Sequence, residues 1–177
     1  MQNLQYEYLV CLALENTEEH PNDNTRFIKS PSVFKFDSTN CKHHIIELAW
    51  CFYSTANKNV TQEYHYYVKP KDTAIINDQV LKRVSVDREK IEQACSFEEV
   101  MKKFYETLFN HSSSACVVVE GDWVIMGQLA YEASEYSIVM PHIFNSYINI
   151  FDSYEQFSSV KCTNLEQIAK GLYLTRN

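Results

Sequence analysis

The chain has 177 residues, 45% of them hydrophobic and 22% charged, which fits an ordinary globular protein and excludes a disordered one. Its 16 Lys and Arg against 23 Asp and Glu give a net charge of −7, which argues against a strong general grip on a phosphate backbone. Neither a membrane-spanning apolar run nor a secretory signal pattern is visible, so we expect an intracellular protein, in the cytoplasm or the nucleus.

Three successive segments are predicted to be strands of an antiparallel meander. Residues 8–14, 45–53 and 64–69 are rich in aromatic and β-branched side chains. The polar segment between the first two, residues 16–42, is longer than most connections in compact domains. We expect it to be a surface loop of a single domain that covers residues 1–177.

Helices are predicted in the second half of the chain. Ser96 and Glu99 form the pattern of a capping box, and apolar residues then recur on one helical face. Residues 116–120 predict a buried strand, and residues 123–133 predict the next helix.

A last helix is predicted near the end of the chain. Thr163 and Glu166 form a second capping-box pattern, which places Asn164 in the first helical turn. The apolar residues of this helix are expected to face inward; they are Leu165, Ile168, Ala169 and Leu172.

The cysteines stand singly along the chain, at positions 11, 41, 51, 95, 116 and 162. Their spacing lacks the close pairs of a zinc site. Cys11, Cys51 and Cys116 lie in apolar, strand-like runs, where thiols behave as small core residues. We therefore predict reduced, structural thiols. His43 and His44 are not predicted to be a ligand pair, because adjacent strand residues point to opposite faces.

Several short segments occur in a recognisable order. They are residues 13–17 (Ala-Leu-Glu-Asn-Thr), 44–48, 67–70, 121–124 (Gly-Asp-Trp-Val), 140–150 and 163–170. In order and spacing they resemble the DEDDh three-prime to five-prime exonucleases, especially the branch that trims histone messenger and small interfering RNA ends. The resemblance implies an α/β, ribonuclease-H-like exonuclease fold, with a mixed five-stranded sheet flanked by helices.

The resemblance also implies five catalytic positions, of which one is retained. The Asp and the Glu of the first motif fall on Ala13 and Glu15, the next Asp on Val124, the His on Ser159 and the last Asp on Asn164. Two-metal phosphodiester hydrolysis needs several carboxylate oxygens around two divalent ions, and a base for the attacking water. The resemblance thus predicts a catalytically degenerate member with no catalytic residue, metal or cofactor.

The substrate grip departs from the family as well. Where the family carries Leu-Thr-Gly-Ile, residues 83–86 read Arg-Val-Ser-Val, which removes the close backbone approach that glycine permits. The resemblance implies a vestigial cleft formed by Glu15, Arg83, Ser85 and Trp123, with no confident substrate-binding residue.

Two further groups of charges leave alternatives open. The acids near the motifs are either solvated or ligands of a rewired metal site; they are Glu18, Glu19, Glu120, Asp122 and Glu166. The densest basic stretch is either a solvated face or a local nucleic-acid patch; it comprises Lys69, Lys71, Lys82, Arg83, Arg88 and Lys90.

Three functions are compatible with these patterns. The first is a scaffold that joins proteins of an RNA-processing or small-RNA silencing complex, as a homo- or hetero-oligomer; 12 Tyr, 10 Phe and 2 Trp suit protein interfaces, although a core also accounts for them. The second is an RNA-binding module that uses the former substrate cleft without cleavage. The third is an active exonuclease with unconventional metal ligands.

Overall fold

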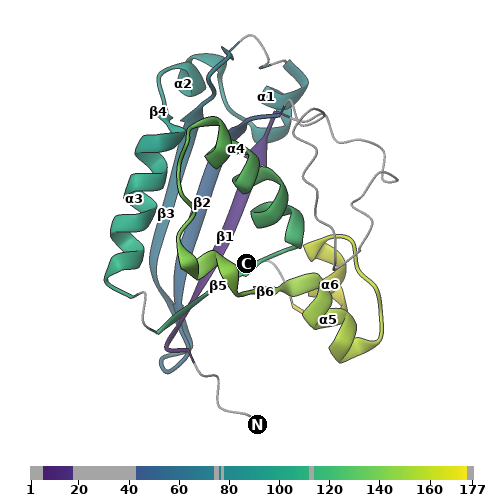
Figure 1. Ribbon diagram of the computed structural model, residues 1–177. Helices are drawn as coiled ribbons and strands as arrows, with labels where there is room; N and C mark the ends of the chain where they lie inside the picture. The colour runs from purple at the N-terminus through teal and green to yellow at the C-terminus, as the bar shows by residue number, and fades with distance from the viewer. Residues whose placement is uncertain (1–5, 18–42, 74–75, 77, 112–113, 175–177) are drawn as a thin grey trace.

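The computed structural model describes residues 6–17, 43–73, 76, 78–111 and 114–174. Its centre is a mixed six-stranded sheet in the order β4-β3-β2-β1-β5-β6 (Figure 1). The strands are β1 (Tyr8–Asn16), β2 (Ile45–Ser54), β3 (Asn59–Lys69), β4 (Cys95–Ser96), β5 (Ala115–Val119) and β6 (Tyr147–Asn149). The predicted α/β class is confirmed, but five strands is the wrong number. Strands of two or three residues, such as β4 and β6, carry too little periodicity to be counted from sequence.

The first three strands form the predicted antiparallel meander. β2 pairs antiparallel with both β1 and β3, whereas β5 runs parallel to β1 and to β6. β3 begins earlier than predicted. Residues 59–63 are exposed and show no alternation of buried and exposed side chains, so the sequence pattern did not identify them as part of the strand. β1 extends into the expected surface loop, and residues 18–42 of that loop lie outside the described part of the chain.

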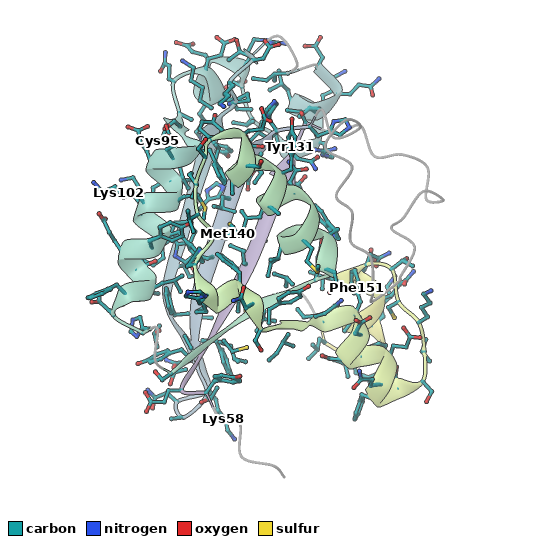
Figure 2. All side chains as sticks on the ribbon, viewed as in Figure 1. Lys58, Cys95, Lys102, Tyr131, Met140 and Phe151 are labelled. Carbon is teal, nitrogen blue, oxygen red and sulfur yellow. The ribbon has the colours of Figure 1, made fainter. Side chains whose placement is uncertain are left out.

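One face of the sheet carries the main core. Val10, Leu12 and Leu14 of β1 are buried on this face, whereas Ala13 and Glu15 point to the opposite one. Residues of α3, of the η2–α4 segment and of η3 pack over the core face, and Figure 2 shows their side chains filling the space above the sheet.

Eight helical segments accompany the sheet in the described residues. They are α1 (Asp78–Val84), α2 (Arg88–Glu92), α3 (Phe97–Phe109), η2 (Trp123–Leu129), α4 (Ala130–Glu135), η3 (His142–Asn145), α5 (Ile150–Ser158) and α6 (Leu165–Gly171). None of the helices that the structure describes is long and apolar enough to cross a membrane.

The capping box predicted for α3 is present. The Glu99 amide donates to Ser96 Oγ (3.3 Å), and the Ser96 amide donates to Glu99 Oε2 (2.8 Å). The predicted apolar stripe is buried, from Phe97 to Leu108. Here local capping and periodicity agree with the tertiary packing.

The helix predicted over residues 123–133 has a different form. Its first part, η2, is a π-helix with wide turns, and only α4 has α-helical geometry. A pattern of apolar residues cannot reveal the extra residue in a wide turn, because π-helix is rare and no propensity marks it. Gln128 and Glu132 of this segment are both buried, beside the end of β1 and the start of β2.

Buried polar side chains tie those two strand ends to the helical segment. Asn16 Nδ2 donates to Gln128 Oε1 (3.0 Å), and Gln128 Nε2 donates to the His43 carbonyl (2.8 Å). Glu132 is fully buried; its carboxylate lies 3.0 Å from His44 Nδ1 and accepts from the Ile45 amide (3.3 Å). We call this set of Asn16, Gln128, Glu132 and His44 the polar brace.

The C-terminal helices α5 and α6 pack on each other, with α5 contributing no buried residue. The inward orientation predicted for α6 is confirmed for Ile168, whereas Leu165 and Leu172 are exposed at 47% and 41%. Helical periodicity identifies the residues that share a face, but not whether anything covers that face.

The polar brace predicts a pH-dependent stability. The hydrogen bond to Glu132 raises the pKa of His44, and burial opposes this effect. The stabilisation from His44 should therefore be complete below the imidazole's unfolded pKa, near 6.5, and be lost as the pH rises through the raised folded pKa. Chemical unfolding between pH 5.5 and 8.5 should show less of this fall in His44→Gln, whereas His142→Gln, which removes an exposed imidazole away from Glu132, should retain it. An equal pH slope in wild type and His44→Gln would contradict the expectation.

Candidate functional site

Glu15, the retained carboxylate, is held by an ion pair at the end of β1. Arg83 Nε lies 3.4 Å from Glu15 Oε2, and Arg83 Nη2 donates to the Asn16 carbonyl. The Arg83 side chain is 21% exposed and that of Glu15 45%, so solvent screens the pair only in part. A fixed guanidinium thus lies beside Glu15.

A small second core positions Arg83 for this contact. Val80 of α1 packs with Ile46, Ile76 and Ile91, which fixes α1 above the start of β2. Arg83 follows Val80 by three residues, close to one helical turn, and so leaves the same helix near Glu15.

Two of the positions implied to be catalytic carry apolar side chains. Ala13 is exposed on the same face of β1 as Glu15 and offers a methyl group only. Val124 lies in the first turn of η2, is 1% exposed and belongs to the main core. An aspartate at position 124 would enter a site that is apolar in this chain.

Ser159 and Asn164 both serve as helix ends. Ser159 ends α5 in the left-handed conformation (φ 59°), and its amide donates to the Glu155 carbonyl. Asn164 Oδ1 accepts from the Gln167 amide (3.0 Å), so Asn164 is the N-cap of α6. The prediction that Thr163 caps this helix is wrong by one residue.

The physical reason for this shift lies in the capping side chains. Asn is at least as good an N-cap as Thr. At the same N-terminus of α6, the side chain of Gln167 accepts a hydrogen bond from the Thr163 amide (2.9 Å). Asn164 therefore precedes the first turn, and its side-chain oxygen is already used.

The neighbouring acids have structural partners. Asp122 is half-buried, and its Oδ1 accepts from Asn149 Nδ2 (2.8 Å) and from the Tyr147 hydroxyl (3.1 Å). Burial, and then the Asp122 charge, raise the pKa of Tyr147 to about 12. Glu166 is exposed and pairs with Lys170 (3.0 Å). Glu18 and Glu19 lie outside the described residues.

Within the part of the chain that the structure describes, the side chains around Glu15 do not offer the oxygens that a pair of divalent ions needs. Such a pair needs several carboxylate oxygens. The described residues contain no group of three or more His, Cys, Asp or Glu side chains arranged to hold a metal. Glu15 is paired with Arg83, and Asn164 offers a neutral oxygen that caps a helix.

The vestigial cleft is brought together only in part. Glu15 and Arg83 are in contact, but Trp123 packs half-buried against the main core. Ser85 adopts φ 52° at the end of α1, a left-handed conformation that favours glycine. The chain thus makes at Ser85 the left-handed turn for which glycine is usually used. Ser85 lies beside a surface hollow lined by residues of α1 and of the segment between α1 and α2.

The basic stretch is largely engaged within the molecule. Lys71 lies 4.4 Å from the centre of the Tyr136 ring and Lys90 4.7 Å from that of Tyr67. Arg88 Nη2 donates to the Ile76 carbonyl (2.5 Å). Four of the six cations are exposed, as the solvated-face alternative expects, namely Lys69, Lys71, Lys82 and Lys90, whereas Arg83 and Arg88 are half-buried and bound within the molecule.

The sequence reasoning missed an exposed apolar surface on the C-terminal helices. It comprises Phe157, Val160, Leu165, Leu172, Tyr173 and Leu174, the largest being Tyr173 at 93% and Phe157 at 79% exposed. We call it the C-terminal apolar face. The apolar periodicity of α6 marks two of these residues, Leu165 and Leu172, for which the sequence predicts an inward orientation.

Comparison with protein families gives one match that covers most of the chain. The family model RNase_T, described as Exonuclease, matches residues 33–177. The match begins after β1, the strand that carries Ala13 and Glu15.

Two curated relatives are similar over most of this chain. The 3′-5′ exoribonuclease 1 of Mus musculus is 22% identical and that of Rattus norvegicus 21% identical, each over 88% of this chain. The chain spans 42% of the length of both relatives.

Solved structures with the same fold include three nucleases. A 3′-exonuclease from a study of 3′-end specific recognition of histone mRNA stem-loop has a TM-score of 0.81 at 19% identity, covering 99% of this chain and 74% of its own. The nuclease domain of 3′hExo, a DEDDh family member, bound to rAMP, scores 0.79 at 19% identity, covering 97% and 82%. Cell-death related nuclease 4 scores 0.75 at 16% identity, covering 97% and 56%. The ribonuclease-H-like exonuclease fold implied by the resemblance is confirmed.

The burial of Val124 leads to a prediction about placing an aspartate at this position. Val124→Asp should lower the free energy of unfolding by several kcal/mol, roughly 3 or more, because an unpaired carboxylate would enter the core. Val124→Ala should cost about 1–3 kcal/mol from lost packing alone. Urea unfolding of both variants, with and without 10 mM Mg²⁺, would measure these free energies. If Mg²⁺ restored the stability of Val124→Asp, it would reveal a metal site that the described donor side chains do not support.

Proposed function

The chain belongs to the exonuclease family, and from this premise we propose that it is a catalytically inactive member that acts as a protein-interaction scaffold in an RNA-processing or small-RNA silencing complex. The observation that carries the first half of this proposal is the ion pair of Arg83 with Glu15. It supplies a protein cation beside the one carboxylate that the family chemistry would use for metal.

Electrostatics supports the loss of hydrolysis. A guanidinium in direct contact with a carboxylate offsets its charge and repels an approaching divalent cation. Ala13 and Val124 supply no oxygen, and the oxygen of Asn164 is neutral. Ser159 cannot act as a base near neutral pH in place of an imidazole. A two-ion mechanism would therefore lack both the oxygens that bind the metal ions and the base that activates the water.

The C-terminal apolar face supports the scaffold role. Six apolar side chains, two of them large aromatics, are exposed on and after α5 and α6. Several large apolar side chains exposed in one region are typical of a protein contact, and aromatic residues are enriched at the centres of such contacts. The relatives named for exoribonuclease activity and histone mRNA recognition favour an RNA-regulatory setting for the partner proteins.

The alternative is an RNA-binding module that does not cleave. It is favoured by the structural relatives, of which one recognises a histone mRNA stem-loop and one is bound to rAMP. The net charge of −7 and the intramolecular contacts of Arg83, Arg88 and Lys90 weigh against it, because RNA binding draws on free cations. An active exonuclease with other metal ligands is the least supported of the three.

A nuclease assay tests the catalytic half. Pure protein incubated with end-labelled single-stranded RNA and Mg²⁺ or Mn²⁺ should leave the substrate intact, while an active family exonuclease in the same buffer trims it. Arg83→Gln should also be inactive, because releasing Glu15 restores a single carboxylate only. Trimming by the wild type that Glu15→Gln abolishes would overturn the proposal.

Affinity purification tests the scaffold half. Tagged wild type from its native cell should recover RNA-processing or silencing proteins, and the double variant Phe157→Ser, Tyr173→Ser should lose them. Phe109→Ser is the matched control, since Phe109 is 82% exposed on α3 and lies outside the C-terminal apolar face. Recovery of RNA without these proteins would instead support the non-cleaving RNA-binding module.

A further inference from the structure

Cys11 and Cys51 are direct neighbours across two strands. They are register partners in the antiparallel pair of β1 and β2. The α-carbons of residues that lie directly opposite in such a pair are about 4.5–5.5 Å apart. A disulfide needs α-carbons about 4.4–6.8 Å apart, so the backbone already has the spacing that this bond requires.

The two side chains share the face of the sheet opposite the main core. Along β1, Cys11 alternates with buried Val10 and Leu12 and lies on the same face as Ala13 and Glu15. Both thiols are half-buried, so small oxidants can reach them. Their register pairing also places the two side chains next to each other on this face, as directly opposite residues of an antiparallel pair are.

From this geometry we propose that Cys11 and Cys51 form a reversible disulfide that links β1 to β2 on the face carrying Ala13 and Glu15. The oxidant is a hydroperoxide or a low-molecular-weight disulfide such as glutathione disulfide. With hydrogen peroxide, one sulfur becomes a sulfenic acid with release of water. The second thiol then displaces the hydroxyl group as another water, so that two thiols and one peroxide give one disulfide and two waters.

With glutathione disulfide the same bond forms by two exchanges. The first thiolate attacks glutathione disulfide and releases one glutathione, leaving a mixed disulfide on the protein. The second protein thiolate attacks the protein sulfur of this mixed disulfide and releases the other glutathione. Burial raises the pKa of both thiols, that of Cys11 to about 11, so the exchange should be faster at higher pH, where more of the reactive thiolate is present.

The remaining described cysteines lack this arrangement. Cys95 lies on β4 at the outer edge of the sheet (Figure 2), and Cys116 on β5 faces Leu9 in the register. Cys162 is buried near the start of α6. Cys41 lies outside the described residues and is therefore included in the test.

The bond would change the stability of the whole domain. It closes the chain from Cys11 to Cys51 into a loop, which reduces the freedom of the unfolded chain. The oxidised protein should therefore unfold at a temperature several degrees higher than the reduced protein. This effect is independent of whether the domain cleaves RNA.

The test is oxidation of the full chain with glutathione disulfide or hydrogen peroxide. Peptide mapping without reductant should find one cross-link between the peptides of Cys11 and Cys51, with loss of about 2 Da. The melting temperature should rise and return with dithiothreitol. Both effects should vanish in Cys11→Ser and in Cys51→Ser, and persist in Cys41→Ser and Cys95→Ser. A cross-link through Cys41, stable mixed glutathione adducts, or no cross-link would each overturn the proposal.

Discussion

The polar brace is the constraint on which the geometry around Glu15 depends. A carboxylate as fully buried as that of Glu132 is tolerated only when hydrogen-bond donors surround it, here the His44 ring and the Ile45 amide. These bonds fix the start of β2, and the bond between Asn16 and Gln128 fixes the end of β1. Because Arg83 binds the Asn16 carbonyl, the cation beside Glu15 is positioned by the same rigid end of the sheet.

The positions implied to be catalytic have acquired structural roles. Val124 fills the main core, Asn164 begins α6 and Ser159 ends α5. Each role stabilises the domain through the feature that makes the residue unfit for hydrolysis: an apolar side chain, a neutral capping oxygen, or a small residue in a left-handed turn. Placing the family residues at these positions one at a time would therefore remove stabilising interactions.

Local sequence patterns identified the elements but not their long-range contacts. The alternation in β1 and β2 and the capping box at Ser96 acted over a few residues, and the structure agrees with them. The pairing of Glu15 with Arg83 joins distant parts of the chain, so neither local pattern could reveal it. Similarly, the periodicity of Leu165 and Leu172 described a face correctly and assigned it to the wrong environment.

The wide turns of η2 make the length of this segment as important as its composition. Removing one residue between Trp123 and Leu129 would favour an ordinary α-helix, in which each residue turns the chain by about 100°. Glu132 would then rotate away from His44 and leave a buried carboxylate without its donors. Insertions and deletions in this helix should accordingly be tolerated far less well than side-chain replacements on its outer surface.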